Sequence, residues 1–83
     1  GNGAGRGMNH PKSPHVVDAR FLEPPEPFTR TMEALEVLPP GESLLLLLYR
    51  EPHPLYRVLN QNGYVYTTEL VADGTFEILI RLA

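Results

Sequence analysis

The chain contains no cysteine anywhere in its 83 residues. This absence excludes disulfides, thiolate metal ligands, persulfides and thioesters on the chain. The sequence also has no apolar segment that could serve as a signal peptide or span a bilayer. Basic residues form no stripe that could neutralise phosphates, and the formal net charge is −3. We therefore expect a cytoplasmic protein that binds neither nucleic acid nor membrane.

The length is sufficient for one small domain. The glycine-rich residues 1–7 are typical of a vector-derived remnant, which would make Met8 the natural start. Residues 8–14 are polar, contain two prolines and are expected to form a flexible tail. The single domain is predicted to span residues 15–83.

Residues 16–27 predict a short strand, a tight connection and the start of a helix. Val16 and Val17 are β-branched and favour an extended backbone. The connection carries two glutamates and three prolines, namely Glu23, Pro24, Pro25, Glu26 and Pro27. Proline suits the first turn of a helix, where its missing amide hydrogen would have no intrahelical partner, and the carboxylates favour the positive end of the helix dipole. We expect any function of the chain to lie in this stretch.

The rest of the chain predicts two helices and three further strands. The apolar periodicity places them at 28–38 (helix), 43–49 (strand), 55–61 (helix), 64–71 (strand) and 75–82 (strand). A proline- or glycine-containing turn signal separates most of them. The order is βαβαββ, with a right-handed crossover between two parallel strands and a final antiparallel hairpin. This order predicts an α+β two-layer sandwich, in which two helices cover one face of a four-stranded mixed sheet.

The segment from Val17 to Pro27 resembles the L-D-A-x-G-L-x-C-P-x-P motif of the TusA/SirA-like sulfur-carrier superfamily. The matching residues are Asp18, Ala19, Leu22, Pro25 and Pro27. Phe21 replaces a glycine of the motif, and Pro24 replaces the sulfur-accepting cysteine. The segment from Pro39 to Leu46 is similar to the x-P-G-E-x-L segment that precedes strand two in that family.

The chain is similar to a cysteine-less, uncharacterised branch of this superfamily, a domain of unknown function with an E-P-x-P-L-like stretch, here Glu51 to Leu55. The resemblance covers nearly all of the chain after the tail. It implies the strand order 1-2-4-3. It implies no sulfur uptake, because Pro24 has no nucleophile.

Two sets of side chains could carry chemistry, and each has a structural interpretation. Glu23 and Glu26 could act as an acid–base pair, or they could only add charge at a helix start. His53 could ligate a metal together with Glu51 and either His10 or His15, or it could be a capping or surface residue. The four tyrosines, Tyr49, Tyr56, Tyr64 and Tyr66, are expected to pack in the core and sheet rather than to form a stacking platform.

Two classes of function remain open. The first is a non-catalytic binding or adaptor module that contacts a protein or a small ligand without a cofactor. Its candidate binding residues are Glu23, Pro24, Pro25, Glu26, Pro27, Glu51, His53 and Pro54. The second is a metal- or small-ligand-dependent enzyme, or a redox-associated accessory protein, that uses His53 with Glu23 and Glu26. The absence of a recognisable catalytic constellation favours the first class.

Two further expectations concern surfaces. The prolines remove amide donors from the first helix start, so we expect a poor anion site that accepts a basic or apolar partner. The leucine-rich strand at 43–49 must place one set of leucines on the side of the sheet away from the helices. Together with Leu79 this predicts an apolar stripe between charges, in a protein that is a monomer or a weak dimer.

Overall fold

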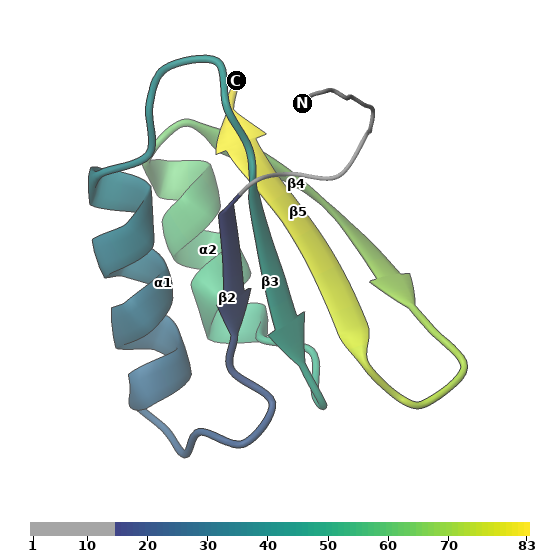
Figure 1. The fold of residues 1–83 in the computed structure, drawn as a ribbon. Coiled ribbons are helices and arrows are strands. Elements are labelled where there is room, and N and C mark those ends of the chain that lie inside the picture. Colours follow the sequence, from purple (N-terminus) through teal and green to yellow (C-terminus); the bar gives the residue numbers. More distant parts are fainter. Residues whose placement is uncertain (1–14) are drawn as a thin grey trace, which may run out of the picture.

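Two helices and four strands make up residues 15–83, the part of the chain that this computed structural model describes (Figure 1). The elements are β2 (His15–Asp18), α1 (Glu26–Glu36), β3 (Leu44–Leu48), α2 (His53–Gln61), β4 (Tyr64–Leu70) and β5 (Phe76–Leu82). The strands form one sheet in the order β2-β3-β5-β4, so the predicted α+β fold and strand order are confirmed. The predictions for residues 1–7 and 8–14 lie outside the described residues.

The sheet contains both parallel and antiparallel pairs. β2 and β3 are parallel, whereas β5 is antiparallel to both β3 and β4. Parallel neighbours need a crossover connection, which α1 supplies between β2 and β3. β4 and β5 are joined by a tight turn in which the Val71 amide donates to the Thr75 carbonyl oxygen at 2.9 Å. Gly74 has a φ of 92° in this turn, a backbone conformation that glycine adopts at little cost.

The core lies between the sheet and the two helices. It consists of Ala19, Leu35, Leu44, Leu46, Leu48, Leu55, Leu59, Ile78 and Ile80. Alternate leucines of β3 enter the core because successive side chains of a strand point to opposite faces. Both helices contribute to the same core, so they cover one face of the sheet (Figure 1).

The opposite face of the sheet carries no helix among the described elements, and we call it the open face. Its side chains are Val16, Asp18, Leu45, Leu47, Val65, Thr67, Glu69, Glu77, Leu79 and Arg81, which alternate with the residues on the helix side. The apolar stripe predicted for this face is present.

α2 begins two residues before its predicted start, and α1 ends two residues earlier than predicted, while α1 begins at Glu26, within the proline-rich stretch that was predicted to open it. The apolar periodicity only begins at Phe28 and Leu55, whereas each first turn is made of proline and polar residues. The core side of α1 also includes Thr31, which the apolar pattern missed because threonine is polar. Thr31 is fully buried and its hydroxyl donates to the Pro27 carbonyl oxygen at 2.8 Å.

Candidate functional site

The two helix starts have the same local sequence pattern and lie at the same edge of the sheet. α1 follows β2 and α2 follows β3, and these two strands are parallel, so both connections leave from their carboxyl ends. The helices open with Pro25-Glu26-Pro27-Phe28 and Pro52-His53-Pro54-Leu55, with a proline at the N-cap and another at the second helical position. In sheets with parallel strands, the space beyond the carboxyl ends is where ligands usually bind.

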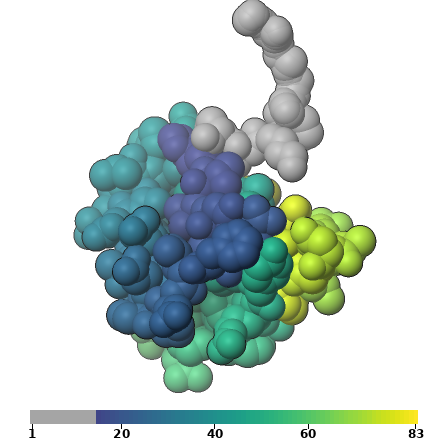
Figure 2. All heavy atoms as spheres, turned by 60° about the horizontal axis from the view of Figure 1, so that its bottom comes forward, coloured from purple at the N-terminus to yellow at the C-terminus, as the bar shows by residue number. Residues whose placement is uncertain are grey.

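A pocket of about 570 Å³ lies between these two connections. Its size is within the range of small-ligand sites. The connections after β2 (blue) and β3 (teal) lie side by side at this end of the molecule (Figure 2). The lining residues are Ala19, Arg20, Leu22, Glu23, Pro24, Pro25, Pro27, Phe28, Leu46, Leu48, Tyr49, Arg50, Glu51, Pro52, Pro54 and Leu55.

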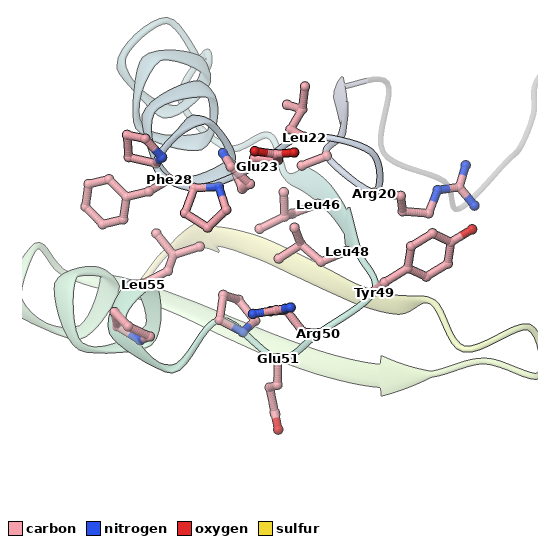
Figure 3. Close-up of a pocket in the computed structure, with 16 residues that line it drawn as sticks. Arg20, Leu22, Glu23, Phe28, Leu46, Leu48, Tyr49, Arg50, Glu51 and Leu55 are labelled. Carbon is pink, nitrogen blue, oxygen red and sulfur yellow. The ribbon is translucent and has the colours of Figure 1, made fainter.

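The interior of the pocket is apolar. Figure 3 shows Leu46 and Leu48 of β3 at the centre of the pocket, with Phe28 and Leu55 of the two helix starts lying together to one side of them. Leu46 and Leu48 are buried, so the floor of the pocket is also the centre of the core. Five proline rings line the pocket, and their fixed φ angles make this wall stiff. The site is therefore pre-formed and suits an apolar group.

The first positions of both helices offer no free amide hydrogen to the pocket. Prolines occupy the N-cap and the second helical position in each case. The amide between them is already used: Glu26 donates to the Glu23 carbonyl oxygen at 2.9 Å, and His53 donates to the Glu51 carbonyl oxygen at 3.1 Å. Helix starts normally bind anions through such amides, so this pocket has fewer donors for an anion than an ordinary helix start.

Charged side chains lie at the mouth of the pocket. Arg20 is engaged by Asp18, whose carboxylate accepts from Nε at 2.9 Å and from Nη2 at 2.7 Å. This pair lowers the pKa of Asp18 and raises the pKa of Arg20. Within residues 15–83, Arg50 and Glu23 form no salt bridge. The two charges that a ligand can meet here are therefore of opposite sign.

Glu51 lines the pocket but directs its carboxylate away from Leu46 and Leu48 (Figure 3). That carboxylate accepts a hydrogen bond from the Tyr56 hydroxyl at 3.0 Å. Burial raises the pKa of Tyr56, whose ring stacks on Tyr66 with a centroid distance of 4.3 Å. Glu51 therefore belongs to a tyrosine cluster beside the pocket rather than to its interior.

His53 does not line the pocket, and its side chain is 74% exposed. Its Nε2 atom lies 3.6 Å from Glu51 Oε1, so two side chains that could each ligate a metal are close together here. His15 contacts Glu42 instead, near the opposite end of β2. No group of three possible metal ligands occurs in residues 15–83, and His10 lies outside that range.

The structure brings six of the eight predicted binding residues to one pocket: Glu23, Pro24, Pro25, Pro27, Glu51 and Pro54. Glu26 and His53 do not line it. Glu26 forms a salt bridge with Arg30 at 3.2 Å, one turn along α1, which agrees with the interpretation of Glu26 as helix-start charge.

Several lining residues were missed by the sequence reasoning, including Arg20, Phe28 and Arg50. A signal was available for the arginines, because each lies two positions after the end of a parallel strand. Tyr49 was expected to pack in the core or sheet. It is instead 49% exposed and makes an edge contact with Phe21, because it follows the last residue of β3 at the pocket mouth.

Fold and pocket together define a small α+β domain with a stiff apolar cavity at the carboxyl edge of its parallel strands. Residues 16–82 match the family described as uncharacterized conserved protein (DUF2249), and the chain belongs to this family. No curated protein matches the chain significantly. Neither helix in residues 15–83 is long and apolar enough to cross a membrane. The prediction of a domain from an uncharacterised family is confirmed, while its link to the sulfur carriers stays a prediction.

Proposed function

We propose that this chain is a non-catalytic binding module whose pocket takes up an apolar, uncharged group of a protein partner or a small ligand. The observation that carries the proposal is the convergence of two proline-started helices on one apolar cavity. The proline wall is stiff before any ligand arrives, so little conformational entropy is lost on binding. We place this activity in the cytoplasm, without a cofactor and without nucleic acid or membrane as partner.

Two features of the pocket support an uncharged ligand over an anion. The first three positions of each helix start have no amide hydrogen to give, as described above. The arginines do not compensate, because Arg20 is held by Asp18 and the charge of Arg50 is opposed by Glu23 at the same mouth. An apolar group is stabilised by burial alone and needs neither an amide donor nor a cationic side chain.

We also propose that the relation to TusA/SirA-like proteins is one of backbone and not of sulfur chemistry. Pro24 occupies the position of the sulfur-accepting cysteine and carries no nucleophile. Its ring lines the pocket instead. The position that holds a persulfide in the carriers would thus contact the bound apolar group in this chain.

Methyl-detected NMR titration tests the proposed ligand class, because the leucines of the pocket carry methyl groups and its prolines lack amides. The probes are indole, which is neutral and aromatic, benzoate, which adds a carboxylate to a ring, and sulfate. We expect indole to shift the methyl signals of Leu46, Leu48 and Leu55 and to bind more tightly than benzoate. Sulfate is expected to leave these signals unchanged.

Phe28→Ala removes one wall of the pocket and provides the matching variant. An aromatic contact contributes about 0.5–1.5 kcal/mol, so indole binding should weaken by about two- to tenfold. Phe21→Ala is the control, since Phe21 is 80% exposed and does not line the pocket. Sulfate binding at the pocket more tightly than indole, or equal effects of the two variants, would contradict the proposal.

A further inference from the structure

The open face carries a continuous apolar row across three neighbouring strands. The register places Val16 of β2 beside Leu45 of β3, and Leu45 beside Leu79 of β5. Val16 is 53% exposed and Leu79 is 37% exposed, so the row is accessible. It lies on the side of the sheet opposite the core and does not depend on the pocket for any of its contacts.

Charges of opposite sign flank this row along β5. Glu77 lies two residues before Leu79, and Arg81 lies two residues after it, all on the same face. Four residues of strand separate Glu77 from Arg81 by about 13 Å, too far for a salt bridge within the chain. Neither residue forms a salt bridge within residues 15–83.

Glu77 also faces a like charge. The register between β4 and β5 places Glu69 directly opposite Glu77, and like charges in that position destabilise a sheet. A cation brought to Glu77 from outside the chain would relieve this repulsion. The charge pattern therefore points to a partner with a positive charge at this place.

We infer that the open face docks on the open face of a second copy of the chain, around a two-fold axis that passes over β5 at Leu79. The axis lies between the two sheets and runs perpendicular to the strands, so it reverses the strand direction and leaves each strand above its own copy. Leu79 then meets Leu79 of the second copy. Arg81 meets Glu77 of the second copy, and Glu77 meets its Arg81.

The sequence Glu77–Ile78–Leu79–Ile80–Arg81 is self-complementary under this operation, which is what an isologous interface requires. The same rotation carries Glu69 towards Val65 of the second copy rather than towards another carboxylate. Sheets pack face to face at about 10 Å, a distance that leucines fill and that long charged side chains can bridge. The apolar row is short, so the dimer is weak.

Charge-swap variants test this arrangement by sedimentation equilibrium of the full chain at several concentrations. Glu77→Arg or Arg81→Glu alone replaces two attractive contacts with two repulsive ones, and exposed pairs are worth about 0.2–1 kcal/mol each, so we expect association to weaken about tenfold. The double variant E77R/R81E restores opposite charges and should associate like the original chain. An equimolar mixture of the two single variants should form a mixed dimer.

Folding does not confound this test, because the arginine introduced by Glu77→Arg faces Glu69 within the chain and removes a repulsion. Leu79→Glu should abolish association by placing two carboxylates on the axis. Val37→Glu is its control, since Val37 is 79% exposed at the end of α1, on the helix side of the sheet. A chain that stays monomeric at every concentration, or a double variant that fails to restore association, overturns the inference.

Discussion

At the scale of single residues, Asp18 and Arg20 hold the connection that leads from β2 to the pocket. Besides its two contacts with the guanidinium, the Asp18 carboxylate accepts from the Arg20 backbone amide at 3.2 Å. Bidentate pairs of this kind fix geometry as well as charge. The hydrogen bonds from Arg20 are the main reason that the pKa of Asp18 is lowered.

Asp18→Asn should make the stability of the protein less dependent on pH. A carboxyl group whose pKa is lowered by folding stabilises the protein above its unfolded pKa of about 3.9, and this contribution is lost as the pH falls through the folded pKa. The variant should therefore be slightly less stable than the original chain at neutral pH. Urea unfolding at a series of pH values should show this difference shrinking below about pH 4. A difference that stays constant into acid would contradict the role of Asp18.

Residue types indicated some of the residues that line the pocket and missed others. The prolines and Glu23 were identified because proline has fixed backbone preferences that can be recognised in any sequence. Arg20 and Arg50 were missed because they are ordinary surface residues in isolation, and only the convergence of two connections gives them a common location. Thr31 was missed because its burial depends on a hydrogen bond to Pro27 within the helix.

At the scale of elements, specific residues in the connections determine where a helix ends and what its end contacts. α2 ends at Gln61 and is followed by Gly63 with a φ of 81°, as the Asn62-Gly63 pair predicted. The Asn62 side chain donates to the Val58 carbonyl oxygen at 2.8 Å. The Gly63 carbonyl oxygen accepts from the Ala83 amide at 2.9 Å, which ties the helix end to the end of β5.

Gly63→Ala should destabilise the protein by about 1–2 kcal/mol, because a side chain is strained in this left-handed conformation. The cost is conformational rather than steric, since a Cβ atom at this position would meet nothing within 4 Å. Chemical denaturation measures the change, with Asn60→Ala on the exposed side of α2 as the control, expected within about 0.5 kcal/mol. Equal effects of the two substitutions would show that the backbone at Gly63 is not strained.

The type and order of all six elements could be predicted, and the ends of β3, β4 and β5 to within one residue, whereas the start of α2 and the end of α1 were each misplaced by two residues. Leucine favours helices slightly, yet five consecutive leucines form β3, because the run is short and bounded by turns. The sequence could not show which leucines face the helices, since both sets are chemically identical. The strand order itself came from a family resemblance and not from the residues.

At the scale of the whole molecule, the pocket and the open face are on different parts of the structure. The pocket lies at the carboxyl end of β3, while the row through Leu79 crosses the middle of the sheet on its other side. A two-fold axis perpendicular to the strands would place the two pockets of a dimer at opposite ends. The pocket could not be predicted as a cavity, because its volume depends on how two connections pack against one another.

The two surfaces should therefore work independently. Leu79→Glu is expected to abolish association without changing the affinity for indole. Phe28→Ala is expected to weaken indole binding without changing sedimentation. A change of affinity with protein concentration, or a change of association on adding indole, would show that the surfaces are coupled.

The prolines of the pocket also bear on how the folded chain is degraded. Exposed connections are normally the places where a protease first cuts a native protein. The glutamates of the two pocket connections and the first residue of α1 are each followed directly by proline, in the pairs Glu23-Pro24, Glu51-Pro52 and Glu26-Pro27. Proline restricts the residue before it and removes the amide hydrogen that a protease subsite would contact, so these bonds resist cleavage. A glutamate-specific protease would have to begin elsewhere, for instance at Glu42 in the turn before β3, so its first cut would spare both pocket connections.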